Sequence, residues 1–263
     1  MDRFPLPFPQ TLIKMKTTIL ILITASLMFN LSAQTAEQWA KQGAAAEGKG
    51  NSTAALAAYR EADKAAPGKA AVLVKIAKQY GDLMTETKSL AARKKLGEQS
   101  LAYSVKALEA DGNSADAHLS VAISTGKLTE FMSNREKIEA SRRIKEQADL
   151  ALKLDPHSDY AHHMLGRWHQ ELASMGTTTR AIARIVYGDL PAASYAEALD
   201  HFDKAQQLRP DRLIHHIEYG RTLAMMDRKE DARRELKNAL SKPAKDKDDI
   251  KAKERGQASL DSL

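Results

Sequence analysis

The chain of 263 residues contains no cysteine, which excludes disulfides, thiol chemistry and lipid attachment at cysteine. Aromatic residues make up only 5% of it, and no segment alternates apolar and polar residues as a half-buried strand does. The net charge is +6, but charges of both signs alternate along the chain, without a basic stripe carrying stacking aromatics. We therefore expect a helical protein with no nucleic-acid partner.

Sequence signatures of catalysis are missing as well. The chain has no Gly-x-Ser-x-Gly turn and no His-Glu-x-x-His pattern. Residues Gly43–Ser52 space glycine and lysine superficially like a phosphate-binding loop, but no strand precedes them. We expect no enzyme activity, no cofactor and no small-molecule substrate.

The first 33 residues have the pattern of a secretory signal peptide. Lys14 and Lys16 precede an apolar run over Ile19–Phe29, and small residues follow it. We expect cleavage after residue 33 and a periplasmic or secreted protein, with Met15 as an alternative start. The alternative is an uncleaved membrane anchor, although the run is shorter than the roughly 18–20 residues needed to span a bilayer.

One four-point spacing recurs along the rest of the chain: alanine, a bulky residue, alanine and proline. It occurs as Ala55, Tyr59, Ala62 and Pro67, as Ala198, Phe202, Ala205 and Pro210, and, with an early proline, as Ala232, Leu236, Ala239 and Pro243. Alanines seven residues apart share one helix face and let another helix approach closely, and the proline ends the unit. This spacing is typical of the second half of a tetratricopeptide repeat, a helix–turn–helix unit of about 34 residues.

Two weaker units lie in between, one over Ser100–Gly112 and one over Ile144–Pro156. The first helix of each unit carries a small residue where its partner helix crosses; these residues are Gly43, Ala77, Ala122, Gly166 and Gly220. The sequence therefore predicts an all-α, right-handed superhelical solenoid of about five tetratricopeptide-like hairpins over residues 34–246. A polar, partly helical tail is expected over residues 247–263.

Three units are longer than one repeat, and we place the extra residues between their two helices. The second helices of two units are expected to be long, over residues 88–110 and 134–154. The third insertion, Met175–Ser194, is expected to contain an extra short helix, Arg180–Tyr187, within the fourth unit. We expect this insertion to fold back across the solenoid and pack near Trp168, because a large, half-apolar side chain favours burial.

The stretch KIEASRRIKEQADLALKLDPHSDYAHHMLGRWHQELASM, residues Lys137–Met175, resembles the regulator of microtubule dynamics family. The shared elements are IKE at Ile144–Glu146, LGRW at Leu165–Trp168, the turn Gly188–Pro191 and the helix start Tyr195–Leu199. The resemblance covers about residues 70–242. It implies a helical-repeat fold and a non-enzymatic role in protein interaction, and the animal members are similar to microtubule- and organelle-associated proteins.

In such repeats the first helices line a concave groove. The candidate groove residues are Lys78, Tyr160, His163, Arg167, Gln170, Ile217 and Arg221. We expect the groove to bind an extended or helical peptide with an acidic group, since arginine offers forked donors to a carboxylate. The alternative is that Arg167 and Arg221 pair internally with Glu171 and Glu218.

Six histidines stand out, at positions 157, 162, 163, 169, 215 and 216. Their spacing does not match that of zinc ligands on a helix, so we expect packing histidines and no metal. The expected function is a scaffold that binds a protein or peptide partner in the cell envelope or outside the cell. The alternative is a self-associating or membrane-peripheral protein with Lys242–Gly256 as a solvated contact arm; membrane contact is expected only if the leader is not cleaved.

Overall fold

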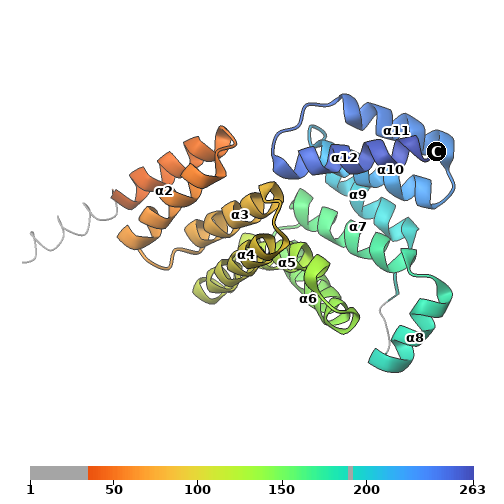
Figure 1. Ribbon diagram of the computed structural model, residues 1–263, viewed down its shortest axis with the longest axis horizontal. Helices are drawn as coiled ribbons and strands as arrows, with labels where there is room; N and C mark the ends of the chain where they lie inside the picture. The colour runs from red at the N-terminus through yellow and green to blue at the C-terminus, as the bar shows by residue number, and fades with distance from the viewer. Residues whose placement is uncertain (1–34, 189–191) are drawn as a thin grey trace, which may run out of the picture.

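The computed structural model describes residues 35–188 and 192–263, and this part of the chain is helical, without a strand (Figure 1). The expected signal peptide lies outside the described residues. Among the described helices, none combines the length and apolarity that a bilayer crossing requires.

Five helical hairpins follow one another along the described chain, as predicted, and stack side by side into a solenoid (Figure 1). They pair the helix over residues 35–48 with α2 (Ser52–Ala65), α3 (Ala70–Glu86) with α4 (Leu90–Ala110), α5 (Ala115–Leu128) with α6 (Asn134–Leu154), α7 (Asp159–Ser174) with α9 (Tyr195–Leu208), and α10 (Leu213–Met225) with α11 (Lys229–Ser241). A short 3-10 turn, η1 (Thr129–Phe131), precedes α6. The long α4 and α6 confirm the two extended second helices.

Small residues meet bulky ones where the helices of three hairpins cross. A Cβ atom on Gly43 would lie 2.7 Å from the Tyr59 ring, and one on Gly166 would lie 2.7 Å from the Phe202 ring. Gly220 stands in the same way against Leu236, at 2.9 Å. The recurring alanine–bulky–alanine spacing is therefore a packing rule, since the bulky side chain needs a glycine opposite it.

In the second hairpin the bulky residue is replaced by serine, and hydroxyl groups fill the crossing. Ser100 Oγ donates to the carbonyl oxygen of Ala77 at 2.8 Å. Ser104 Oγ lies 2.7 Å from Ser120 Oγ and 2.9 Å from Ser124 Oγ, so α4 and α5 share a buried hydroxyl network. Each hydroxyl has a partner, which removes the cost of burying it.

Serine also starts several of the helices. The side chain of an N-cap serine accepts a hydrogen bond from a backbone N–H of the first turn in five helices, at Ser89, Ser114, Ser133, Ser158 and Ser194. Ser133 and Glu136 form a reciprocal capping box at the start of α6. These caps satisfy backbone donors that the helix leaves free, which fixes where each helix begins.

The C-terminal segment is a docked helix, α12 (Lys247–Asp261), so the expected solvated arm is wrong. Its Ala252 is buried in an apolar cluster with Leu213, Ile217 and Leu236. A Cβ atom on Gly256 would lie 2.5 Å from Ile217, which shows how closely α12 approaches α10. The segment looks polar in sequence because the residues that it buries are Asp249, Ala252 and Gly256, none of them a large apolar side chain.

The extra helix of the fourth unit is present as α8 (Thr177–Tyr187), but it does not fold back across the solenoid. Figure 1 shows α8 extending away from the hairpins, and Ile185 is 84% exposed. Trp168 is buried, as predicted, but α6 covers it: Ile144 packs against it, and its Nε1 donates to Ser141 Oγ at 2.9 Å. From the insertion, Ala193 reaches this cluster.

Candidate functional site

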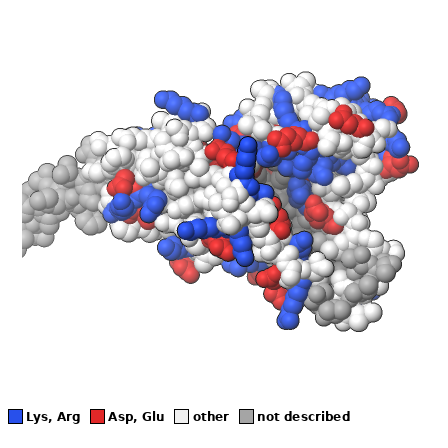
Figure 2. Space-filling model, in the orientation of Figure 1, with Lys and Arg blue, Asp and Glu red and all other residues white. Residues whose placement is uncertain are grey.

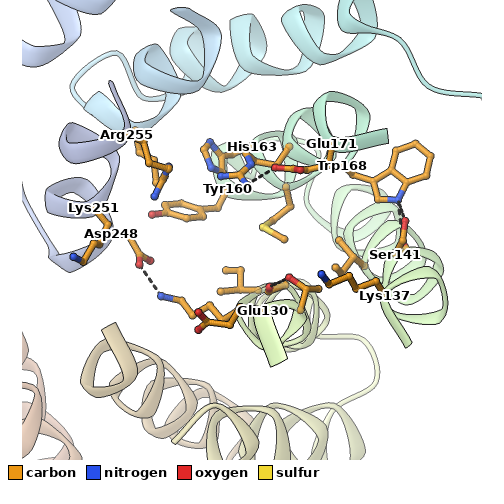
Figure 3. Close-up of a pocket in the computed structure, with 18 of the residues that line it drawn as sticks. Glu130, Lys137, Ser141, Tyr160, His163, Trp168, Glu171, Asp248, Lys251 and Arg255 are labelled. Carbon is orange, nitrogen blue, oxygen red and sulfur yellow. Dashed lines mark hydrogen bonds and ion pairs between the residues drawn. The ribbon is translucent and has the colours of Figure 1, made fainter. Parts of the chain in front are cut away.

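A cavity of about 880 Å³ opens on the concave face, between α5, α6, α7 and α12 (Figures 2 and 3). Figure 3 shows Asp248, Lys251 and Arg255 of α12 on one side of the cavity, and Trp168 and Ser141 on the opposite side. In Figure 2 charged side chains gather around a hollow on this face. We call this cavity the concave pocket.

The floor of the concave pocket is apolar. It is formed by Met84, Ile123, Ile144, Met164, Trp168, Leu172, Met175 and Ile214. Three of these side chains are methionines, which are flexible and polarisable and adapt to ligands of different shape. The floor is therefore suited to a large apolar side chain of a partner.

Cationic side chains dominate the rim of the concave pocket. Six of them line it, namely Arg93, Lys127, Lys137, Arg167, Lys251 and Arg255, against three carboxylates, Glu130, Glu171 and Asp248. Lys137 is exposed and has no ion-pair partner among the described residues, and Lys251 is exposed and pairs with Glu254 of its own helix at 2.8 Å. Glu218, behind the rim, also pairs with Arg167 and Arg255, so the free positive charge of the rim lies mainly at Lys137, and this charge favours an acidic ligand.

Behind the rim, one buried carboxylate is shared by three arginines. The Oε1 atom of Glu218 accepts from Arg167 Nη1 at 3.3 Å and from Arg255 Nη2 at 2.8 Å, and Oε2 accepts from Arg221 Nη1 at 2.5 Å. Burial would raise the pKa of Glu218, but the three guanidinium groups hold it well below its usual value. The ionised Glu218 therefore fixes Arg167 and Arg255 at the edge of the pocket.

A buried histidine pair stands beside this carboxylate. His163 Nδ1 lies 3.1 Å from His215 Nδ1, and His215 Nε2 lies 2.9 Å from Asp159. Burial lowers the pKa of His163 well below its usual value, so this ring is neutral at the pocket wall. The Tyr160 hydroxyl accepts a hydrogen bond from Arg212, which also binds Asp246 before α12.

A second histidine cluster, which includes His201, lies between α7 and α9. His162 Nδ1 lies 3.1 Å from His201 Nδ1, and the His169 ring stacks on His201 with a centroid distance of 5.5 Å. Burial and the two neighbouring imidazoles lower the pKa of His201 to about 4. His201 is not among the histidines that stand out in the sequence, although it directly precedes the packing residue Phe202. No group of three or more metal-ligating side chains in the described ranges is arranged to hold a metal ion.

The structure brings only part of the predicted groove together. Tyr160, His163 and Arg167 line the concave pocket, but Lys78, Gln170, Ile217 and Arg221 do not. The alternative of internal pairing is what Arg167 and Arg221 show, since both bind Glu218.

The three other predicted residues also have partners inside the molecule. Lys78 pairs with Asp82 at 2.7 Å, and Gln170 Nε2 donates to Thr222 Oγ1 at 2.8 Å. Ile217 is buried under Gly256 of α12. The pocket residues that the prediction missed, Lys127, Lys137, Lys251 and Arg255, come from later turns of α5, from α6 and from α12. Repeat positions give no signal for α12.

The sequence matches the family described as regulator of microtubule dynamics protein 1-3 over residues 34–263. Among curated relatives, regulator of microtubule dynamics protein 3 of Xenopus laevis is 29% identical over 138 residues, covering 52% of this chain and 30% of that protein. Protein 1 of Bos taurus is 32% identical over 113 residues, covering 43% of this chain and 36% of that protein. The matched parts thus span about a third of the length of these relatives.

Solved structures agree on the architecture. A thermophilic TPR protein of Thermus thermophilus superposes with a TM-score of 0.62 at 14% identity, covering 86% of this chain and 98% of that one. The pilF protein of Pseudomonas aeruginosa gives a TM-score of 0.52 at 15% identity, covering 88% and 89%. At these identities the likeness concerns the fold alone. The chain is a tetratricopeptide-like helical repeat protein, and it belongs to the regulator of microtubule dynamics family.

Proposed function

We propose that this protein is a non-catalytic scaffold that holds an acidic segment of a partner protein in the concave pocket. In keeping with the signal-peptide pattern of residues 1–33, the proposed location is the cell envelope or outside the cell. The observation that carries the proposal is the composition of the pocket: six cationic side chains against three carboxylates, above an apolar floor.

Both halves of the pocket restrict the chemistry of the partner segment. The rim attracts carboxylates, because a low-dielectric concave surface strengthens the field of its charges. The floor stabilises a bound aliphatic or aromatic side chain by removing it from water, at about 25 cal/mol for each Å² buried. We therefore expect a segment in which acidic residues flank at least one large apolar residue.

The two exposed lysines of the rim allow a direct test. Lys137→Glu combined with Lys251→Glu reverses two rim charges and touches no buried carboxylate, so the fold is expected to stay intact. A matched control reverses two other exposed lysines outside the pocket, Lys153→Glu and Lys237→Glu. Each protein is used to select binders from a displayed library of random peptides, and the selected sequences are compared.

The wild-type protein and the control are expected to enrich peptides that combine aspartate or glutamate with a large apolar residue. The rim variant is expected to lose this enrichment, because two attractive charges have become repulsive. Enrichment of the same acidic peptides by the rim variant, or of peptides without acidic residues by the wild type, would contradict the proposal.

A further inference from the structure

Helix α12 touches the rest of the protein in two chemically different ways. Towards α10 it packs through Ala252, which is buried in the core cluster, and through Gly256 against Ile217, and its Arg255 binds the buried Glu218 at 2.8 Å. Towards the second and third hairpins, the side-chain contacts of its first turn are ion pairs: Lys247 with Glu86 of α3 at 2.8 Å, and Asp248 with Lys127 of α5 at 2.6 Å. Figure 1 shows this end of α12 beside α3, across the concave face.

The Asp248 carboxylate lies on a cation of the concave pocket. Lys127 and Asp248 both line the pocket, and their side chains remain 20% and 30% exposed. Burial would raise the pKa of Asp248, but Lys127 and more distant cations hold it below its usual value, so the carboxylate is ionised. Lys127 reaches it over α3, where Gly81 leaves room for the lysine stem and the Thr85 hydroxyl lies 3.4 Å from Nζ.

From this arrangement we infer that Lys127 is the carboxylate receptor of the concave pocket and that Asp248 is an internal competitor, which an acidic partner must displace. The inference rests on the proposed function and deepens it. Asp248 shows by its own position which chemical group Lys127 accepts. It also closes the solenoid, because the pair joins α12 of the C-terminal end to α5 of the third hairpin.

Displacement of Asp248 is energetically accessible, whereas detachment of α12 is not. The two ion pairs are partly exposed to solvent, and such pairs contribute little to stability and weaken in salt. The apolar contact with α10 is buried and stays in place. The expected movement is therefore an opening between α12 and the second and third hairpins, with α12 still attached to α10.

The first arm of the experiment measures this opening without any ligand. Because the chain has no cysteine, Lys88→Cys and Ile250→Cys introduce two exposed labelling sites on opposite sides of the closing contact. The distance between two attached spin labels is measured by pulsed electron resonance. Asp248→Lys is expected to lengthen it, because Lys127 then faces a like charge, and Asp149→Asn, which breaks a 2.6 Å pair within α6, is expected to leave it unchanged.

A charge swap separates closure from effects on the helix itself. Lys127→Asp combined with Asp248→Lys restores an opposite pair while keeping the same lysine in the first turn of α12, where it opposes the helix dipole. The label distance is expected to return to the wild-type value. A distance that Asp248→Lys does not change, or that the swap does not restore, overturns the inference.

The second arm measures competition with a defined probe, a short fluorescent peptide of glutamate, leucine and phenylalanine, alongside its glutamine counterpart. Asp248→Ala is expected to bind the acidic peptide about two- to fivefold more tightly than the wild type, and Lys127→Ala more weakly. Equal or weaker binding by Asp248→Ala overturns the competitor role. If neither protein binds the acidic peptide while the label distance still responds to Asp248→Lys, the proposed function fails, and the closure remains without a competitor role.

Discussion

Buried serine hydroxyls make the polar contacts between α4 and α5, whereas α7, α10 and α12 meet around a buried, ionised carboxylate that pairs with three partly exposed arginines. The hydroxyls are neutral, and each can both donate and accept a hydrogen bond, so the loss of one leaves no uncompensated charge. The carboxylate Glu218 has no neutral substitute, because three cations depend on it. The hydroxyl network between α4 and α5 is thus expected to tolerate substitution, whereas the contact around Glu218 is not.

The sharpest way to break this comparison is to neutralise the shared carboxylate. Glu218→Gln leaves the partly exposed Arg167, Arg221 and Arg255 facing one another around a side chain that is itself fully buried. We expect the free energy of unfolding to fall by about 3–5 kcal/mol, measured by urea denaturation, since breaking a buried ion pair leaves uncompensated charge. The exposed Glu98→Gln is the control and is expected to stay within about 0.5 kcal/mol. A loss below about 1 kcal/mol for Glu218→Gln would show that the carboxylate is not essential.

A second test concerns the helix crossing at which a glycine faces a bulky side chain. The second hairpin has no such crossing, because serine replaces the bulky residue there. Gly166→Ala places a Cβ atom 2.7 Å from the Phe202 ring, and the ring is itself fully buried. We expect a loss of about 1–3 kcal/mol of unfolding free energy from overpacking. Gly48→Ala, where no atom lies within 4 Å, is the control and is expected to be nearly neutral.

A double-mutant cycle checks that the Gly166 effect arises at the ring. Gly166→Ala with Phe202→Leu is expected to lose less stability than the sum of the two single changes, because the smaller leucine relieves the clash. Strict additivity of the two losses would place the clash elsewhere.

The histidine cluster between α7 and α9 is expected to make the stability of the fold depend on pH. The pKa of His201 is about 4 in the folded chain against an ordinary value of 6.5, so the unfolded chain takes up its proton first. The free energy of unfolding should therefore decrease as pH falls from 6.5 to 4, by about 2–3 kcal/mol from this residue. Denaturation at several pH values should show a shallower decrease for His201→Gln than for the exposed control His157→Gln. Identical pH profiles for the two variants would contradict the assignment.

The smallest effect is expected at the serine network. Ser104→Ala removes one hydroxyl from between Ser120 and Ser124, and Ser124 keeps its contact with Ser100. We expect a loss of about 1 kcal/mol of unfolding free energy, with the exposed Ser262→Ala as the control. A loss of unfolding free energy as large as that of Glu218→Gln would remove the difference between the serine network and the contact around Glu218.

The hairpins could be predicted from sequence because their signals are local. Alanines seven residues apart, a bulky residue between them and a closing proline are all contained in one helix and its turn, and the observed α4 and α6 match the expected ranges. The crossings of Gly43, Gly166 and Gly220 were predicted for the same reason. Family resemblance added the fourth unit, where LGRW precedes the insertion.

The concave pocket could be predicted only in part, because it depends on how far the solenoid curves. Arg167 was found from its repeat position, but Lys127 and Asp248 are separated by 121 positions along the chain. The docking of α12 was missed because Ala252 and Gly256 do not form an apolar stripe. The position of α8, which extends away from the hairpins, was not predicted, because nothing in its sequence shows that α6 already covers Trp168.

The three arginines on Glu218 come from α7, α10 and α12, which belong to the last two hairpins and the closing helix. Helical arrays ordinarily fray from their ends, one unit at a time. Here α12 cannot detach without breaking the pair between its Arg255 and Glu218, the carboxylate that also binds Arg167 of α7 and Arg221 of α10. The C-terminal third should accordingly lose its amide protection in hydrogen exchange as a single block, while the N-terminal hairpins fray in steps.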